Sequence, residues 1–244
     1  MPTRTNKWEQ PTTLVSSVVT PVVARFAKDA DYASGGALDP TPAPPESEVR
    51  ATMAAVADGK WTIVVANKAG SALTTTHGIN RGVPEPDGGR PSPGTMGNGA
   101  TATLVVPTGW AGQMAFATAG ASIIGDESLT EASFIDQPSN PGLAPGDIDV
   151  SYVDGHSLPI ICRCRADGLF LSGCLDPLGA CPTELVNVHG SCKNPKRHET
   201  GQVDPHPFFN PCQGRAYTFP EDSKGNTNGK CQSGIVDCEV HPRR

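Results

Sequence analysis

The sequence predicts an all-β fold, a disulfide-linked β-sandwich of short strands joined by loops. Its 244 residues include 27 Gly and 24 Pro but only 5% aromatic residues. This composition suits strands joined by turns and disfavours helical bundles, in which Gly and Pro are destabilising. All eight cysteines lie after residue 160, in a stretch rich in turn residues. Short β-branched runs separated by turn signals favour a sandwich over a βαβ fold.

Charge and hydropathy exclude several classes of protein. The formal net charge of −6 at pH 7 provides neither a basic footprint for nucleic acid nor a polybasic patch for a membrane surface. No run approaches the roughly 18 apolar residues needed to cross a bilayer, so we expect no membrane span. The sequence contains no phosphate-binding loop, no G-x-S-x-G and no H-E-x-x-H motif, and we expect no cofactor.

Residues 1–59 predict a poorly structured leader and linker, and residues 60–244 a single β domain. Residues 28–50 are rich in Pro, Asp, Glu, Ser and Gly, and they bury too little apolar surface to offset their ordering entropy. A short helix is expected at 48–57. Leu14–Ala27 is only weakly apolar and contains a proline and an arginine, which makes it a poor signal peptide. Either the signal is atypical or the natural N-terminus is missing, and we favour the second interpretation.

The first half of the domain predicts two strand pairs. Trp61–Ala66 is rich in β-branched residues and ends in Asn-Lys-Ala-Gly, and Ser71–His77 follows at hairpin distance. Residues 80–99 are too dense in Gly and Pro for regular structure. Thr101–Val106 and Gln113–Thr118 flank a Pro-Thr-Gly-Trp turn, which predicts a second hairpin.

The second half predicts further strands. Ser128–Phe134 and Ile148–Val153 alternate in character, as half-buried strands do. Leu158–Cys162 is a short apolar run. Arg215–Phe219 and Ile235–Val240 are expected to be the last strands, after a series of cysteine-containing loops.

The cysteines are the most informative residues. An even number in a loop-rich region indicates disulfides and an extracellular address, secreted or in the cell wall, with a cysteine-rich lobe over about residues 162–212. Zinc is the alternative, kept open by His189, His198 and His206, although the spacing shows one C-x-C and then wide gaps. Paired cysteines leave no thiol for Cys–His catalysis. The eight residues are Cys162, Cys164, Cys174, Cys181, Cys192, Cys212, Cys231 and Cys238.

Several segments, in this order along the chain, resemble the thaumatin-like (osmotin) family. Asp147–Ile160 (DIDVSYVDGHSLPI) resembles its D-V-S-x-V-D-G-[FY]-N-[LV]-P segment, and residues 204–219 (DPHPFFNPCQGRAYTF) resemble its D-Y-S-x-F-F-x-x-x-C-P-x-A-Y-S-Y. The similarity runs from about Trp61 to the C-terminus and implies a compact, fungal-type member with a reduced cysteine-rich lobe. Shorter matches are Val65–Leu73, Ser128–Phe134, Gly179–Leu185 and the closing cysteine pair.

The resemblance also implies a disulfide scheme. The family's first cysteine, which pairs with its last, falls on Ala69 here, so Cys238 lacks its usual partner. One member of the C-x-C pair would pair with Cys231 and leave the other for Cys238. The implied bridges are therefore Cys174–Cys212, Cys181–Cys192, and Cys231 with either Cys162 or Cys164.

An acidic cleft is the functional feature that the resemblance implies. Its carboxylates fall on Glu131, Asp149, Asp154 and Asp204. Because glycoside hydrolysis needs a proton donor and an ionised carboxylate, Glu131 and Asp154 are predicted as the catalytic pair, and Asp149 and Asp204 as substrate-binding residues. Ala117 stands where the family has its cleft arginine, so the usual charge partner is missing.

Each carboxylate also has a structural interpretation. Asp154 precedes a glycine, as in many tight turns. Asp149 fits the solvent-facing position of an alternating strand. Asp204 precedes a proline and would cap a loop. Glu131 has the least structural reason to be charged, because it stands between the strand residues SLT and ASF.

These features together predict a monomeric, secreted or cell-wall protein whose acidic cleft binds polysaccharide. The resemblance implies β-1,3-glucan as the polysaccharide. We expect at most weak endo-glucanase activity, because a fold alone does not establish enzymatic activity. Trp61, Trp110 and Phe116 would either stack on sugars or pack in the core. The alternatives are a non-enzymatic defence or host-interaction protein, contacting its partner through residues 80–99, and a structural wall protein.

Overall fold

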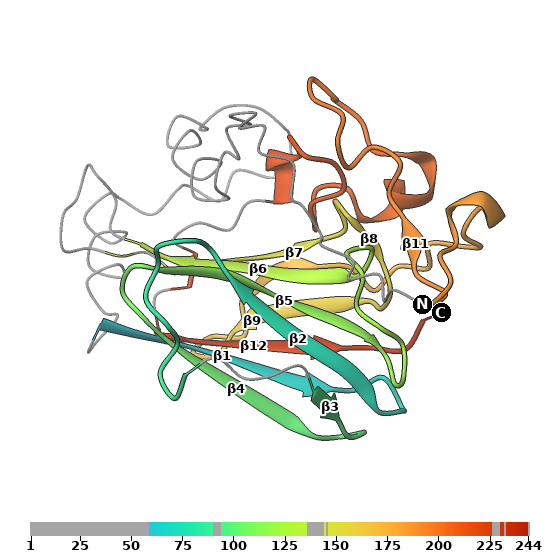
Figure 1. Ribbon diagram of the computed structural model, residues 1–244. Coiled ribbons are helices and arrows are strands. Elements are labelled where there is room, and N and C mark those ends of the chain that lie inside the picture. The colour runs from blue at the N-terminus through green and yellow to red at the C-terminus, as the bar shows by residue number, and fades with distance from the viewer. Residues whose placement is uncertain are drawn as a thin grey trace, which may run out of the picture.

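The computed structural model describes residues 59–89, 94–135, 144, 146–225, 230, 231 and 233–243. They form two packed β-sheets with a loop-rich lobe on one side (Figure 1). The all-β fold expected from the composition is confirmed. The predicted leader and the predicted helix at 48–57 lie outside the described residues, except for Gly59.

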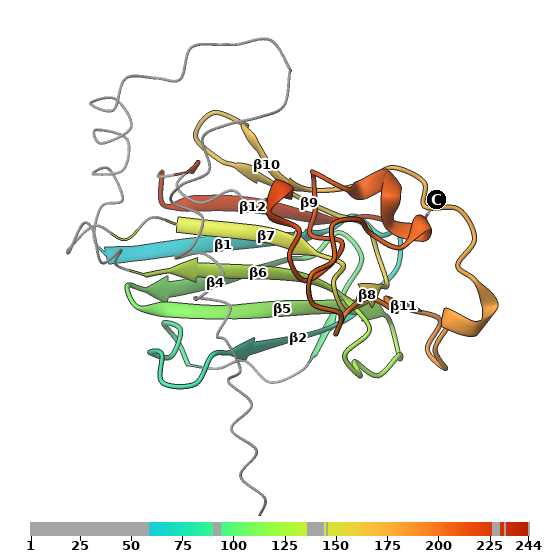
Figure 2. The ribbon, with the colours of Figure 1, turned by 90° about the horizontal axis from the view of Figure 1, so that it is seen from above.

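The first sheet, sheet A, has the strand order β10-β9-β12-β1-β4. Its central strands β1 and β12 run parallel, although they come from opposite ends of the described chain (Figure 2). The other neighbouring strands are antiparallel. The strands are β1 (Lys60–Asn67), β4 (Thr101–Pro107), β9 (Ile160–Cys164), β10 (Phe170–Gly173) and β12 (Ile235–Val240).

The second sheet, sheet B, has the strand order β3-β2-β5-β6-β7 and is antiparallel throughout. A separate two-stranded ribbon pairs β8 (Gly155–His156) with β11 (Cys192–Lys193). The strands of sheet B are β2 (Leu73–Ile79), β3 (Gly94–Met96), β5 (Trp110–Thr118), β6 (Ser128–Phe134) and β7 (Gly146–Ser151).

The strand predictions are largely confirmed, but the two predicted hairpins are wrong. β1 pairs with β4 and β12, whereas β2 pairs with β3 and β5, so each short connection crosses from one sheet to the other. Asn67 organises the first crossing. Its buried side-chain amide donates to the carbonyls of Ser71, Met96 and Gly97 at 2.8, 3.1 and 2.9 Å. These bonds direct the chain into the second sheet.

Arg215–Phe219, predicted as a strand, makes only isolated bridges, among them that of Tyr217 with Ser151. The cause lies at Asp222, which is 1% exposed. Its carboxylate accepts from the N–H and the hydroxyl of Thr218 at 3.1 and 2.6 Å, which turns the chain. Burial raises the pKa of Asp222, and the bonds from Thr218 oppose this shift.

The sequence predicts no regular structure for residues 80–99. This prediction is wrong for Gly94–Met96, which form strand β3. Asp87 also forms a bridge with Val105, and its carboxylate pairs with Lys60 at 2.7 Å. The chain at Asp87 therefore lies along the edge of sheet A at β4, whereas β3 pairs with β2 in sheet B.

The hydrophobic core fills the space between the two sheets. On β1, Trp61, Ile63 and Val65 alternate inward, as a period of two requires. The Trp61 ring lies 6.1 Å from that of Phe134. A Cβ at Gly146 would lie 2.5 Å from the Trp61 indole, so only glycine lets β7 begin there. Trp61, Trp110 and Phe116 are at most 2% exposed, so they pack in the core and offer no surface to a sugar.

All eight cysteines form disulfides, and the predicted Cys174–Cys212 and Cys181–Cys192 pairs are confirmed. The choice that the sequence left open is resolved as Cys162–Cys238 and Cys164–Cys231. In the β9–β12 register Cys162 lies directly opposite Cys238. No cysteine remains as a zinc ligand, so the zinc alternative is wrong for these residues. Four disulfides fit a secreted protein.

The lobe comprises residues 174–225 and lies on the β7 side of the sandwich (Figure 1). It begins at Cys174 rather than at Cys162, because β9 and β10 belong to sheet A. No helix among the described residues is long and apolar enough to cross a membrane. The helices of the lobe are the short 3-10 turns η3 (Thr183–Leu185), η4 (Pro207–Cys212) and η5 (Ser223–Gly225).

The disulfide pairing can be tested by mass spectrometry of unreduced protein cut with trypsin and Asp-N. Trypsin cuts between the two cysteines of the C-x-C pair at Arg163, and Asp-N separates Cys231 from Cys238 before Asp237. We expect fragment 154–163 linked to 237–243, and fragment 164–165 linked to 231–236. Linkage of 154–163 to 231–236 would show the other pairing and contradict the β9–β12 register.

Candidate functional site

A row of polar side chains crosses three strands of sheet B. Gln113 on β5 is paired with Glu131 on β6, and Glu131 is paired with Asp149 on β7. Directly opposed residues of antiparallel strands share a face, with Cβ atoms about 4.5–5.5 Å apart. Their strand neighbours Ala132 and Ile148 belong to the core, so this acidic row (Gln113, Glu131 and Asp149) occupies the opposite face.

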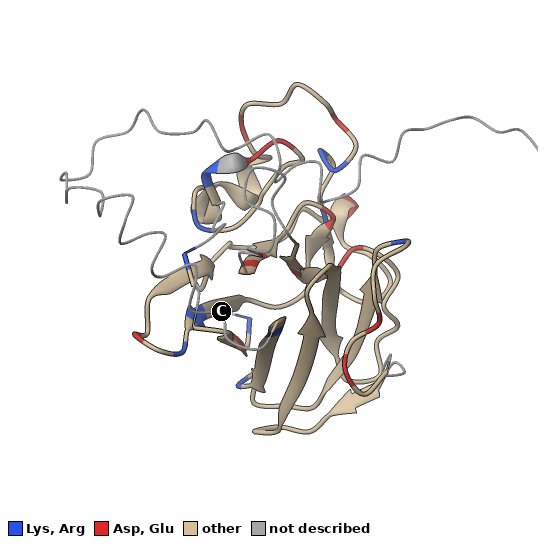
Figure 3. Ribbon diagram, turned by 90° about the vertical axis from the view of Figure 1, so that its left-hand side faces the viewer, with Lys and Arg blue, Asp and Glu red and all other residues tan. Residues whose placement is uncertain are grey.

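Exposure falls along the acidic row. Gln113 is exposed, Glu131 is partly buried, and Asp149 is only 1% exposed. On β2 the next position is Gly78, which has no side chain to block the row. The row is therefore open above β5 and covered above β7, and acidic segments lie where the strands meet the lobe (Figure 3). The interpretation of Asp149 as a solvent-facing residue is wrong, because the lobe side of β7 is buried.

Further polar residues flank the acidic row. Asp147 lies two residues before Asp149 on the same face of β7 and is 2% exposed. Ser133 is opposite Asp147 on β6, and Ser151 continues the same face of β7. Sequence reasoning missed Asp147 as a site residue, although the period of two that selects Asp149 selects Asp147 as well.

Asp154 follows the end of β7 at Ser151 by three residues and is partly buried. It is not opposite Glu131 in the register, where Asp149 stands. The Asp154 carbonyl accepts the N–H of Asn194 at 3.1 Å. The next residue must be glycine, because a Cβ at Gly155 would lie 2.4 Å from the Asp126 carbonyl oxygen. Asp154 is thus held against the lobe at the end of the strand.

Asp204 lies in the lobe and is exposed. Its carbonyl accepts a hydrogen bond from the Lys196 ammonium at 3.0 Å. It is not part of the acidic row. Ala117, the position of the family's arginine, is 1% exposed on β5.

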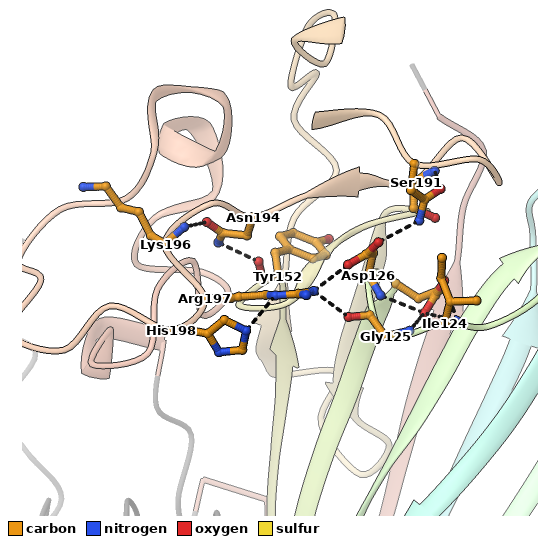
Figure 4. A network of polar contacts seen from close by, with 11 residues as sticks. Ile124, Gly125, Asp126, Tyr152, Ser191, Asn194, Lys196, Arg197 and His198 are labelled. Carbon is orange, nitrogen blue, oxygen red and sulfur yellow. Dashed lines mark hydrogen bonds and ion pairs between the residues drawn. The ribbon is translucent and has the colours of Figure 1, made fainter. Parts of the chain in front are cut away.

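A cation nevertheless reaches this region from the lobe. Arg197 donates to the Asp126 carboxylate at 2.5 Å and to the Gly125 carbonyl at 3.2 Å (Figure 4). Asn187 donates to the other carboxylate oxygen at 3.0 Å. Asp126 is 4% exposed, so its carboxylate is shielded from water, whereas the Arg197 side chain stays partly exposed. Sequence reasoning missed it, because 71 residues separate the two partners and no local pattern links them.

Glu127 forms a second buried carboxylate beside the first and is 1% exposed. It accepts the backbone N–H groups of Ile124, Gly125 and Asp126 at 3.1, 2.8 and 3.0 Å. Such a concave set of N–H groups stabilises an anion. Asp126 and Glu127 immediately precede β6, so their contacts fix the start of the strand that carries Glu131.

His156, two residues after Asp154, is 7% exposed. Its ring makes edge contacts with Tyr152 at 5.0 Å and with Phe208 at 6.2 Å. Burial and, to a smaller extent, the positive charge of Arg243 lower the pKa of His156 from 6.5 to about 3. The imidazole is therefore neutral at physiological pH.

No protein-family model matches the chain, and no curated protein matches it. Among solved structures, the chain is similar to a laminaripentaose-producing β-1,3-glucanase in complex with laminaritetraose, with 16% sequence identity and a TM-score of 0.33. The alignment covers 57% of this chain and 54% of the glucanase, so the chain spans about half the length of that protein. A TM-score this low carries no inference about fold or activity.

The Arg197–Asp126 ion pair should stabilise the contact between lobe and sheet. Arg197→Ala should lower the free energy of unfolding by about 2 kcal/mol, because it leaves a buried carboxylate without its cation. Arg165→Ala is the control, since Arg165 pairs with Asp237 where both side chains are largely exposed, and it should cost less than about 1 kcal/mol. Urea denaturation measures both values. Equal losses of unfolding free energy in the two variants would contradict a larger contribution from the Arg197–Asp126 pair.

The neutral His156 should make the protein sensitive to acid. Because its folded pKa lies below the unfolded value, its contribution to stability is present above pH 6.5 and is lost progressively as pH falls toward 3. Between about pH 6.5 and pH 5 this amounts to about 2 kcal/mol. His156→Phe keeps the ring contacts and should remove that part of the pH dependence in urea denaturation. An unchanged pH dependence would refute the burial of a neutral ring.

Proposed function

We propose that this chain is a secreted, thaumatin-like protein that binds polysaccharide across the acidic row. The observation that carries the proposal is the direct pairing of Glu131 with Asp149 on neighbouring strands, with Gln113 in line on the third. The four disulfides support a secreted protein. The sequence motifs quoted above support the thaumatin-like assignment.

The chemistry of the acidic row suits a neutral polysaccharide. Carboxylate oxygens accept hydrogen bonds from sugar hydroxyls, and the amide of Gln113 both donates and accepts. Nucleic acids and acidic polysaccharides would be repelled by the carboxylates, whereas an uncharged glucan is not. We therefore propose β-1,3-glucan, the substrate class that the resemblance implies.

Hydrogen bonds rather than ring stacking would provide the affinity. Trp61, Trp110 and Phe116 are in the core and cannot form an aromatic platform. The open end of the row, at Gln113 and Gly78, would admit the chain as far as the partly exposed Glu131, and the buried Asp149 would support Glu131 from behind. We therefore expect modest affinity for a single site, strengthened on an insoluble polymer by multiple contacts.

Weak hydrolysis would use the same carboxylates. Two carboxyl groups on opposed strand positions repel each other when both are ionised, so such a pair favours holding one proton between them. A retaining mechanism requires carboxyl groups about 5 Å apart, which the Cβ spacing of an opposed pair allows. Burial disfavours the charged form, so the buried Asp149 would hold the proton and the partly exposed Glu131 would remain ionised. Asp154, the partner that the sequence predicts for Glu131, is the competing candidate.

A pull-down on insoluble β-1,3-glucan tests the proposal. Glu131→Gln should reduce the bound fraction about tenfold, because it removes a hydrogen bond to a charged group, and Asp149→Asn should reduce it less, because Asp149 is buried and acts through Glu131. Asp237→Asn, on β12 of the other sheet, is the matched control and should bind like the wild type. Absence of wild-type binding, or unchanged binding by both variants, would reject the proposal.

Two further measurements distinguish between the two carboxylate pairs and between binding and hydrolysis. Asp154→Asn in the same pull-down tests whether the ligand reaches the end of β7, and lost binding would favour the pair predicted from the sequence. A reducing-sugar assay on the same glucan tests hydrolysis. Binding without released sugar would identify a binding protein rather than an enzyme.

A further inference from the structure

A second pocket lies between the lobe and the segment that follows Gly155. A pocket of about 80 Å³ is bounded by polar side chains and by an apolar wall. Because a water molecule occupies about 30 Å³ of liquid, this volume suits a group of a few heavy atoms. The polar side chains are His156, Asp176 and Arg243, and the wall includes Leu178, Phe208 and the Cys181–Cys192 disulfide.

His156 is the first reason to expect a ligand in this pocket. The residue is more than nine-tenths buried, and neither ring nitrogen makes a hydrogen bond with any described residue. Buried polar groups are hydrogen-bonded as a rule, so a partner from outside the chain is expected. A neutral imidazole presents one N–H donor and one acceptor to such a partner.

Arg243 is the second reason. Its Nε donates to the carbonyl of Ser157, and its Nη1 donates to that of Gly190 at 2.7 Å. These bonds fix the guanidinium and leave Nη2 without an acceptor in the described part of the chain. Partial burial of the guanidinium lowers the pKa of Arg243, although the residue as a whole is exposed.

The charge balance of the pocket favours an anion. Its carboxylate, Asp176, already forms an ion pair with Arg215. Arg243 has no carboxylate partner among the described residues, so the pocket has one uncompensated positive charge. Arg243 is exposed as a residue, but a guanidinium whose acceptors are backbone carbonyls still gains from a charged hydrogen-bond partner. A metal cation would be repelled.

We propose that this pocket binds the carboxylate group of a small organic acid. One carboxylate oxygen accepts from Nη2 of Arg243 and the other from the ring N–H of His156. The apolar part of the acid packs against Phe208. Two donors match the two oxygens of a carboxylate, whereas a phosphate dianion would keep unsatisfied oxygens and, with twice the charge, would be repelled more strongly by Asp176.

The pocket is independent of the acidic row. Its charge has the opposite sign, and its ligand differs in class from a neutral glucan. The inference therefore does not depend on the proposed polysaccharide binding, and either can fail alone.

Ligand-observed NMR with the full chain at pH 7 tests the pocket, with acetate, benzoate and inorganic phosphate as probes. Benzoate should bind saturably with a Kd of about 1 mM, and more tightly than acetate because its ring contacts Phe208. Arg243→Gln and His156→Phe should each raise the Kd at least about tenfold, whereas Arg165→Gln, which removes an arginine from the outer face of sheet A, should leave it unchanged.

Three results would overturn the proposal. The first is no saturable carboxylate binding by the wild type up to about 100 mM. The second is unchanged benzoate affinity in both pocket variants, with their folding checked by near-UV circular dichroism. The third is tighter binding of phosphate than of benzoate, which would reject the carboxylate as the ligand class. The wild-type titrations decide the first and third even if a variant fails to fold.

Discussion

The burial of β7 on both faces is the constraint on which the lobe and the candidate site depend. All six of its residues are buried, although Asp147, Asp149 and Ser151 lie on the face away from the core. Strands covered on both faces are normally apolar, so the lobe must cover this one without leaving its polar groups unpaired. The backbone of Tyr217 does part of this, since it bonds to the Val150 carbonyl and to the Tyr152 N–H at 2.9 and 2.8 Å. The lobe thereby extends the sheet at its open edge.

Disulfides cross-link both the lobe and the C-terminal end of sheet A. Two of the four bridges lie within the lobe, and the other two connect β9 to β12 and to the segment before it. None lies in sheet B, whose strands are held by register and by the shared core. The Cys162–Cys238 bridge spans 76 residues, and cross-links across long loops restrict the unfolded chain most. Two covalent links therefore fix the loops of the lobe, and two fix the C-terminal end of the chain to sheet A.

The strands of this protein could be predicted from the sequence because a period of two is a local signal, and Ser128–Phe134 matches residue for residue. The sheet crossings could not, because a hairpin and a crossing use the same turn residues, and the acceptors of Asn67 at Met96 and Gly97 are 29 and 30 residues away. The sequence also could not show which of Cys162 and Cys164 pairs with Cys238, because this depends on the register of β9 against β12. Arg197 and Asp126 had no sequence signal, because their contact exists only once the lobe is folded.

Three lobe or near-lobe arginines show how charge separates the two candidate sites. Arg197 neutralises the carboxylate of Asp126 near the start of β6, and Arg215 neutralises that of Asp176. Arg243 alone of the three has backbone carbonyls as its only acceptors among the described residues. Carbonyl dipoles orient a guanidinium but do not cancel its charge, so the positive charge of Arg243 adds to the larger effect of burial in lowering the pKa of His156. An anion between Arg243 and His156 would accept hydrogen bonds from both side chains at once. The Arg197–Asp126 and Arg215–Asp176 pairs are already neutralised and need no such anion.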